Sequence, residues 1–250
     1  MQMEEDGGIT VLYKGQTAVE LASVGMTTAT RGEGLVFKKI KKTGNIVDSY
    51  EMVGGKKLLC SNEANEYVYQ FKDSLQKDIK LVFRLYNDGV GMRYTLDGEG
   101  EVDILDEQTE FAAVADYEAH WIAGSYDDDE YAYMHTPLSG ITRETMAKSG
   151  NPARQLPYPA VNTPVTMVTT NGTHVAIHEA ALWHYPAMSL RYDAERNTFT
   201  SDLAAVGEVK SRVELPFSTP WRTIIVGDRA GELIESTLTL NLNEPCRLED

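Results

Sequence analysis

Short runs of β-forming residues, separated by turn residues, recur along most of this 250-residue chain. Residues 80–86 (Lys-Leu-Val-Phe-Arg-Leu-Tyr) and 90–96 are two such runs, and Asn87-Asp88-Gly89 between them is typical of a tight hairpin turn. The same pattern predicts further strands at residues 66–71, 166–170, 173–177, 189–192, 198–201, 221–226 and 238–242. Many short strands and few helices predict an all-β fold, either an antiparallel sandwich or a barrel.

Helical periodicity is scarce. Residues 228–236 could form two turns, with Asp228 as the N-cap and with Leu233 and Ile234 facing inward. Residues 142–163 hold one glycine and three prolines and are predicted to form a long loop, a feature that is usually functional or disordered. No repeat or linker divides the chain, so residues 1–250 are predicted to form a single domain.

The charge of the chain limits its partners. A formal net charge of −15 would repel nucleic-acid backbones and anionic membranes, whereas it suits a neutral substrate such as a sugar, or a cation. No apolar run of about 18 residues predicts a membrane-spanning helix. The acidic start of the chain lacks the apolar segment of a signal peptide. Cys60 and Cys246 form no metal-binding pattern; two buried thiols are favoured over one disulfide.

Glu179 poses the sharpest chemical question. It lies within residues 175–182 (Val-Ala-Ile-His-Glu-Ala-Ala-Leu), a run that is otherwise almost entirely apolar. A buried carboxylate is normally neutralised, paired with a cation or bound to a metal, so a partner is expected. On a strand, His174 and His178 share one face and Glu179 points to the other, which argues against a zinc site.

Aromatic residues are the candidates for sugar contacts. Trp121, Trp183 and Tyr126 could stack on sugar rings, although a tryptophan is more often a core residue, as predicted for Trp221. The acidic run that follows Tyr126 lacks the spacing of a calcium-binding loop, and a solvated acidic loop is the favoured interpretation.

Several segments, in order from about residue 50 to the end, carry a family resemblance. They are Phe83-Arg84, Asn87-Asp88-Gly89-Val90, Trp121-Ile122, Tyr126-Asp127, Glu130-Tyr131, Thr136-Pro137-Leu138-Ser139, Ile177-His178-Glu179-Ala180-Ala181-Leu182, Thr219-Pro220-Trp221-Arg222-Thr223-Ile224 and Leu240-Asn241-Leu242-Asn243-Glu244-Pro245-Cys246. Each segment is short, but together they resemble the N-terminal domain of glycoside hydrolase family 97.

The resemblance implies a fold and a role. Family members are secreted or periplasmic bacterial α-glycosidases of polysaccharide utilisation, including α-glucosidases and α-galactosidases. They join an antiparallel β super-sandwich, resembling galactose mutarotase, to a catalytic (β/α)8 barrel whose carboxylates perform the chemistry. The resemblance also implies a calcium ion between sandwich and barrel, with Glu179 as the sandwich's metal ligand.

The chain departs from the family because it ends at Asp250, where the barrel would begin. Glycoside hydrolysis needs two carboxyl groups flanking the scissile bond, and no such pair stands out here, so no catalytic residue is predicted in this chain. We therefore expect a non-catalytic domain, inactive alone, whose partners are the barrel and a neutral oligosaccharide. A single side chain cannot hold calcium tightly, so we expect Glu179 of the chain alone to be metal-free, at a docking surface, paired with water or a neighbour.

Two alternatives stay open. The chain could be a stand-alone carbohydrate-binding module that uses Trp183, Trp121 or Tyr126 for stacking. It could also be a mutarotase-like sugar epimerase with Glu179 as base and His178 as acid. Adjacent residues on a strand point to opposite faces, which makes His178 and Glu179 a poor pair for one substrate.

Overall fold

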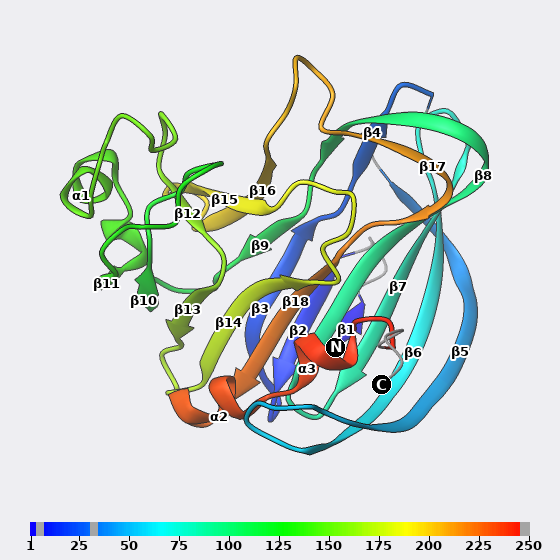
Figure 1. Cartoon of the computed structure of the whole chain (residues 1–250), viewed down its shortest axis with the longest axis horizontal. Coiled ribbons are helices and arrows are strands. Elements are labelled where there is room, and N and C mark those ends of the chain that lie inside the picture. Colours follow the sequence, from blue (N-terminus) through cyan, green and yellow to red (C-terminus); the bar gives the residue numbers. More distant parts are fainter. Residues whose placement is uncertain (4–7, 31–34, 246–250) are drawn as a thin grey trace.

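Two large antiparallel sheets make up the molecule (Figure 1). The computed structural model describes residues 1–3, 8–30 and 35–245. The smaller sheet has the strand order β1 (Gln2–Met3), β2 (Ile9–Tyr13), β3 (Gln16–Ser23), β9 (Glu110–Ala112), β16 (Thr198–Leu203), β15 (Met188–Asp193) and β12 (Ala160–Asn162). The prediction of an all-β sandwich with few short helices is confirmed.

The larger sheet has eleven strands. Its order is β11 (Met134–Pro137), β10 (Glu118–Trp121), β13 (Val165–Val168), β14 (His174–Ala180), β18 (Trp221–Gly227), β8 (Gly89–Glu107), β7 (Asp78–Tyr86), β6 (Leu59–Lys72) and β5 (Val36–Glu51). Two more strands, β17 (Ser211–Ser218) and β4 (Met26–Thr28), pair with the curved far part of β8. The first part of this long strand lies between β18 and β7, and its later, curved part pairs with β17 and β4 (Figure 1).

The main core lies between the two sheets and is built by alternate residues of each strand. On β14, Val175 and Ile177 belong to this core, together with Phe83 and Tyr94 of the large sheet and Phe199 of the small one. Ala176 and Ala180, which alternate with the core residues of β14, belong to a second cluster on the opposite, outer face of the large sheet. The strand that carries Glu179 is therefore packed on both faces.

Residues 238–242 were predicted as a strand, and this prediction is wrong. They form the short helix α3 (Leu238–Asn241), which lies across the outer face of the large sheet (Figure 1). Leu238 and Leu242 are four residues apart, so one helical turn places both against Trp221 in the outer cluster. The same two leucines also fit the period of a strand, and only the sheet beneath them decides between the two structures.

The helix predicted in 228–236 and the long loop predicted in 142–163 need partial correction. The helix expected in 228–236 is α2 (Ala230–Glu235), but its N-cap position is Arg229, and Ile234 is exposed while Leu233 packs inward. Asp228 instead forms a hydrogen bond with Lys14.

The predicted long loop 142–163 contains α1 (Arg143–Lys148), as well as β12, and a short 3-10 helix η1 (Leu138–Gly140) precedes it. Thr142 caps α1 through a reciprocal hydrogen-bond pair with Thr145.

The hairpin turn at Asn87-Asp88 is confirmed, since Tyr86 of β7 pairs with Gly89 of β8. A Cβ atom on Gly89 would lie 2.3 Å from the backbone oxygen of Ile224 and 2.8 Å from Leu238 Cδ1. Only a residue without a side chain therefore allows β18 and α3 to approach this turn.

We expect Gly89→Ala to lower the free energy of unfolding by roughly 2 kcal/mol or more, because the added methyl group collides with backbone that cannot move aside. Urea denaturation followed by circular dichroism measures the change. Gly44→Ala in β5 is the control, since no atom lies within 4 Å of its added Cβ; its free energy should change by less than about 0.5 kcal/mol. Equal losses in both variants would contradict the steric explanation.

Candidate functional site

The cation that meets Glu179 is Arg222. The two residues are directly opposite each other on the neighbouring strands β14 and β18, and Arg222 Nη1 donates to Glu179 Oε2 at 2.6 Å. The Arg222 side chain is fully buried and that of Glu179 is 7% exposed. The expectation of a docking-surface carboxylate paired with water or a neighbour therefore needs correction, because the neighbour is a cation inside the sandwich.

A second carboxylate, Glu107, holds the other side of Arg222. Arg222 Nε and Nη2 donate to its Oε1 and Oε2, both at 2.7 Å, in a bidentate pair that is fully buried. Tyr185 Oη and Thr109 Oγ1 each donate to Glu107 at 3.1 Å. We call Glu107, Arg222 and Glu179 the triad.

A register irregularity turns Glu107 inward. Where β4 pairs with β8, Thr28 is opposite Ile104 and Thr27 is opposite Asp106, so the pairing skips one residue. Ile104 points into the core, and strict alternation would place Glu107, three residues later, on the solvent side. The irregularity reverses the alternation, as β-bulges do, and Glu107 enters the core.

The triad also fixes the loop of residues 181–187, which joins β14 to β15. The backbone N–H of Met188, just after the loop, donates to Glu179 Oε1 at 3.1 Å, and Tyr185 within the loop donates to Glu107. Ala181 and His184 have left-handed backbone conformations, with φ of 54° and 51°. Such conformations are costly for residues other than glycine and cluster at functional sites. Between them Trp183 is 66% exposed.

A hollow of about 320 Å³ lies beside this loop. Its lining includes Tyr185, Pro186, Val206 and Lys210, and Val206 is almost fully exposed. The Tyr185 ring therefore contributes to an open surface hollow while its hydroxyl group reaches the buried triad. Trp183, on the same loop as Tyr185 and Pro186, adds an exposed aromatic ring.

The triad carries an excess negative charge, since two carboxylates and one guanidinium sum to −1. Burial by itself would lower the pKa of Arg222, but Glu107 and Glu179 outweigh burial and raise it, so the guanidinium stays protonated. Burial raises the pKa of Glu179, and Arg222 opposes that rise. Burial and Glu107 raise the pKa of Tyr185, so its hydroxyl group remains a donor.

The other sequence candidates lie apart from the triad. His178 shares the outer face of β14 with Ala176 and Ala180, and its Nδ1 is 3.2 Å from Thr163 Oγ1. Trp121 is a core residue, a correction of its candidacy for sugar stacking: it is fully buried and its Nε1 donates to Thr136 Oγ1 at 3.0 Å. No face of this ring is open to a sugar.

Tyr126 and Trp183 keep accessible rings. Tyr126 is 44% exposed and donates to Asp202 of β16 at 2.7 Å, so it belongs to the surface of the small sheet. Among the candidate substrate-contacting residues, His178 adjoins Glu179 on the opposite face of β14, and Trp183 is on the loop that the triad holds.

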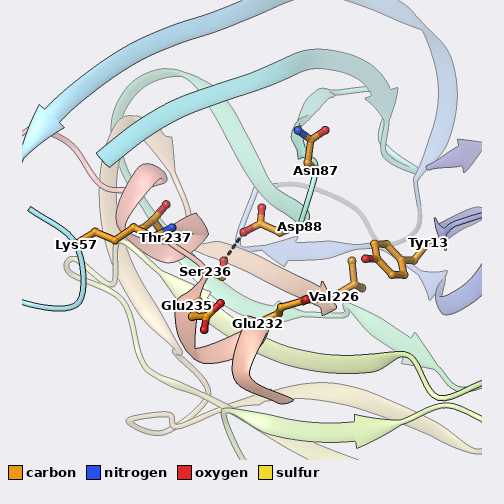
Figure 2. A pocket seen from close by; sticks show the side chains of 9 residues that line it. All are labelled: Tyr13, Lys57, Asn87, Asp88, Val226, Glu232, Glu235, Ser236 and Thr237. Atoms are coloured by element: carbon orange, nitrogen blue, oxygen red, sulfur yellow. Dashed lines mark hydrogen bonds between the residues drawn. The ribbon is translucent and has the colours of Figure 1, made fainter. Parts of the chain in front are cut away.

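A second hollow, of about 220 Å³, lies between α2 and the β7–β8 turn; Figure 2 shows its lining. Asp88, Glu232 and Glu235 give it an acidic wall, with Lys57 at one side. Ser236 donates to Asp88 at 2.7 Å, and Glu232 accepts the Asp228 backbone N–H. These acids serve the local structure around α2, and the triad remains the better candidate site.

The sequence signal for Arg222 is the one that marks Glu179: a lone charge inside an apolar strand, here residues 221–226. The contact between Arg222 and Glu179 does not follow from these two signals, because strand register cannot be read from either segment. Glu107 and Tyr185 have no comparable signal.

Within residues 1–3, 8–30 and 35–245, no group of three or more histidines, cysteines or acids could hold a metal. Cys60 is a free, buried thiol, and Cys246 lies outside the described residues.

Comparison with known proteins assigns the chain to a family. Residues 3–245 match the model of the glycosyl-hydrolase 97 N-terminal domain. The chain belongs to this family. Because the match extends over nearly the whole chain, the resemblance seen in the short segments is confirmed as that of an N-terminal domain.

Three relatives show how much of a longer protein the chain represents. It is 28% identical over 94% of its length to a probable retaining alpha-galactosidase of Streptomyces bingchenggensis, of which it covers 34%. It is 23% identical to a retaining alpha-galactosidase of Bacteroides thetaiotaomicron, with 76% of the chain and 30% of the relative covered. A glycoside hydrolase family 97 enzyme from Pseudoalteromonas sp. strain K8, solved with panose, superposes with a TM-score of 0.83 and 28% identity over 99% of the chain and 36% of the enzyme.

This chain thus spans about a third of the length of these relatives. A crystal structure of a beta-arabinopyranosidase, at 22% identity and a TM-score of 0.73 over 88% of the chain and 36% of that protein, shares the fold. Among the described helices, none is long and apolar enough to cross a membrane.

We expect Arg222→Met to lower the free energy of unfolding by roughly 3–5 kcal/mol, because it leaves two buried carboxylates without their cation. Chemical denaturation measures the loss. Arg196→Met is the matched control, since Arg196 makes a bidentate pair with Glu110 but its side chain is 53% exposed; this change should cost less than about 1 kcal/mol. A loss below about 1 kcal/mol for Arg222→Met would show that the triad is not a folding constraint.

Burial lowers the pKa of His178 from its usual value of 6.5, and this gives a pH dependence with a definite sign. The unfolded chain takes up a proton at higher pH than the folded one, so the contribution of His178 to stability is complete above pH 6.5. It is lost as the pH falls through the lowered folded-state pKa. Unfolding measured between pH 7.5 and 5 should therefore show falling stability on acidification, and His178→Gln should reduce the slope. An unchanged slope in the variant would rule out His178 as a source.

Proposed function

We propose that this chain is the non-catalytic N-terminal domain of a calcium-dependent α-glycoside hydrolase. In that enzyme it contributes Glu179 as a calcium ligand and the 181–187 loop to the surroundings of the substrate. A catalytic domain, present in the longer relatives, contributes the reacting carboxylates. The proposal rests on family membership and on one observation in the structure: the triad has a surplus negative charge, and Glu179, with 7% of its side chain exposed, is the least buried of its three residues.

The donor set of Glu179 fits a hard cation. Calcium prefers carboxylate and carbonyl oxygens, and each oxygen of Glu179 accepts one hydrogen bond, which leaves a further acceptor site on each. A cation bound to Glu179 would balance the charge of −1. Calcium takes about six to eight oxygens, so the remaining ligands come from outside the described residues.

When bound, calcium supplies a fixed positive charge that can orient and polarise an oxygen of the substrate. The residues of this chain hold the ligand for it: Arg222 and the Met188 N–H fix the two oxygens of Glu179. Tyr185 ties the 181–187 loop to Glu107, so that Trp183 is held at the surface beside the site. Holding Glu179 and holding the 181–187 loop are both positioning roles, and neither requires a chemically reactive side chain.

A non-catalytic role agrees with the arrangement of the acids. A glycosidase needs two carboxyl groups with room for a glycosidic bond between them. Glu107 and Glu179 are close enough to share one guanidinium, but that guanidinium fills the space between them and is fully buried. A sugar cannot enter this pair.

The substrate we propose is a neutral oligosaccharide with an α-linked sugar. The relatives are named alpha-galactosidases, and the Pseudoalteromonas enzyme is solved with panose and with acarbose. The net charge of −15 is compatible with a neutral ligand and unfavourable for an anionic one. The sugar specificity depends on residues outside this domain.

A carbohydrate-binding module is the second candidate, and Trp183 favours it. An exposed tryptophan on a conformationally fixed loop is a suitable platform for a sugar ring. Calorimetric titration of the chain with maltooligosaccharides and galactosides separates the two functions. Saturable binding that is lost in Trp183→Ala supports the module, and a flat trace excludes it.

The 250-residue chain alone should release no nitrophenol from nitrophenyl α-glucoside or α-galactoside, with or without calcium, because Arg222 fills the space between Glu107 and Glu179 where a glycosidic bond would have to lie. Absorbance assays at high protein concentration test this. Turnover that survives repurification and depends on an acid of this chain would overturn the non-catalytic assignment.

In the complete enzyme, we expect Glu179→Gln to weaken calcium binding by about tenfold or more, since it removes a charged ligand without changing the shape of the side chain. Isothermal titration calorimetry measures the affinity. Glu110→Gln is the control of equal charge change, because Glu110 pairs with Arg196 on the other sheet. Equal calcium affinity in wild type and Glu179→Gln would remove Glu179 as a ligand.

A further inference from the structure

We propose that Glu107 is a positioning residue for the metal site: by neutralising Arg222, it leaves Glu179 with the negative charge that a cation needs. This inference rests on the proposed function. It assigns a role in calcium binding to a fully buried residue that reaches Glu179 only through Arg222.

The first step is the unequal sharing of the guanidinium. Arg222 gives two parallel hydrogen bonds to Glu107 and one to Glu179. A bidentate pair is the stronger of the two arrangements and sets the plane of the guanidinium. Arg222 is therefore primarily the partner of Glu107, and Glu179 keeps one oxygen that Arg222 does not contact.

The second step is the rigidity of Glu107. Both of its oxygens accept further hydrogen bonds, from Tyr185 and from Thr109, and the residue is fully buried. Glu107 is therefore held in this orientation by four hydrogen bonds, and Arg222 would leave it without a cation if it turned to form a bidentate pair with Glu179. The Tyr185 ring, with its centroid 5.7 Å from the guanidinium carbon, packs beside this arrangement.

The third step is the charge seen by a cation. With Glu107 ionised, the triad sums to −1 and a divalent ion near Glu179 is attracted. Without the charge of Glu107, Arg222 and Glu179 sum to zero, and the guanidinium 2.6 Å from Glu179 repels the ion. Charge interactions are weakly screened inside a protein, so a buried charge acts on a neighbouring site without touching it.

The test compares variants of the complete enzyme by calcium titration in an isothermal calorimeter. We expect Glu107→Gln to weaken calcium binding by about tenfold or more, although Gln has the same shape as Glu and Glu179 is unchanged. The double variant Glu107→Gln/Arg222→Gln removes both buried charges and returns the charge of −1 to Glu179. It should recover part of the affinity lost in Glu107→Gln, although Arg222 no longer fixes an oxygen of Glu179. Glu110→Gln, with an equal charge change on the other sheet, should bind calcium as the wild type does.

Recovery in the double variant separates charge from structural damage, because a second core substitution would not repair a distorted site. If Glu107→Gln does not fold, Arg222→Gln is compared with the double variant: tighter calcium binding by Arg222→Gln, which keeps the charge of Glu107, supports the inference, and equal binding overturns it. Wild-type affinity in Glu107→Gln together with weak binding in Glu179→Gln overturns this inference alone. Wild-type affinity in both single variants overturns the proposed calcium role of Glu179 as well.

Discussion

The guanidinium of Arg222 joins three parts of the chain that are far apart in sequence. It links β18 to Glu179 of β14 and to Glu107 at the far end of β8, and through Glu107 it reaches the 181–187 loop. Taking these charges out of water is costly, and the attraction between them offsets that cost only when every donor and acceptor is satisfied. Three hydrogen bonds from Arg222, with those from Tyr185, Thr109 and Met188, give each guanidinium nitrogen and each carboxylate oxygen of the triad at least one partner. Such a cluster serves mainly to fix one arrangement of β8, β14, β18 and the 181–187 loop, and adds less to the free energy of unfolding.

That arrangement determines what the domain presents at its surface. The loop after Glu179 has two residues with left-handed backbone conformations, and hydrogen bonds to the triad hold it at its middle and at its end. Trp183 is exposed on a loop whose backbone is fixed from inside. A group that must meet a ligand or another domain gains from such support, because little conformational entropy is lost on contact.

The sequence predicted the parts of the fold that depend on local patterns. The hairpin at Asn87-Asp88 and the strands around it follow from turn chemistry and β-forming residues. Residues 238–242 were misassigned because the spacing of Leu238 and Leu242 fits both a strand and a helical turn, and only contact with Trp221 decides between them. The burial of Trp121 likewise depends on how strands assemble, which composition does not show.

The candidate site could be found only in part from the sequence, for a related reason. Glu179 was recognisable because an apolar run surrounds it, and the same argument applies to Arg222. Their contact depends on the register of two strands separated by some forty residues of chain, and register is a property of the sheet. Glu107 could not be found at all, since its inward direction comes from an irregular pairing that leaves no signal in one sequence.

The skipped residue in the pairing of β4 with β8 has an evolutionary consequence. Insertion or deletion of one residue between Ile104 and Glu107 would turn the Glu107 side chain from the core to solvent, with no substitution of any residue in the triad. In related chains, the length of this short stretch therefore carries as much information about the buried charge as the identity of the amino acid. An alignment that places a gap there would hide the loss of Glu107 from the core behind a conserved glutamate.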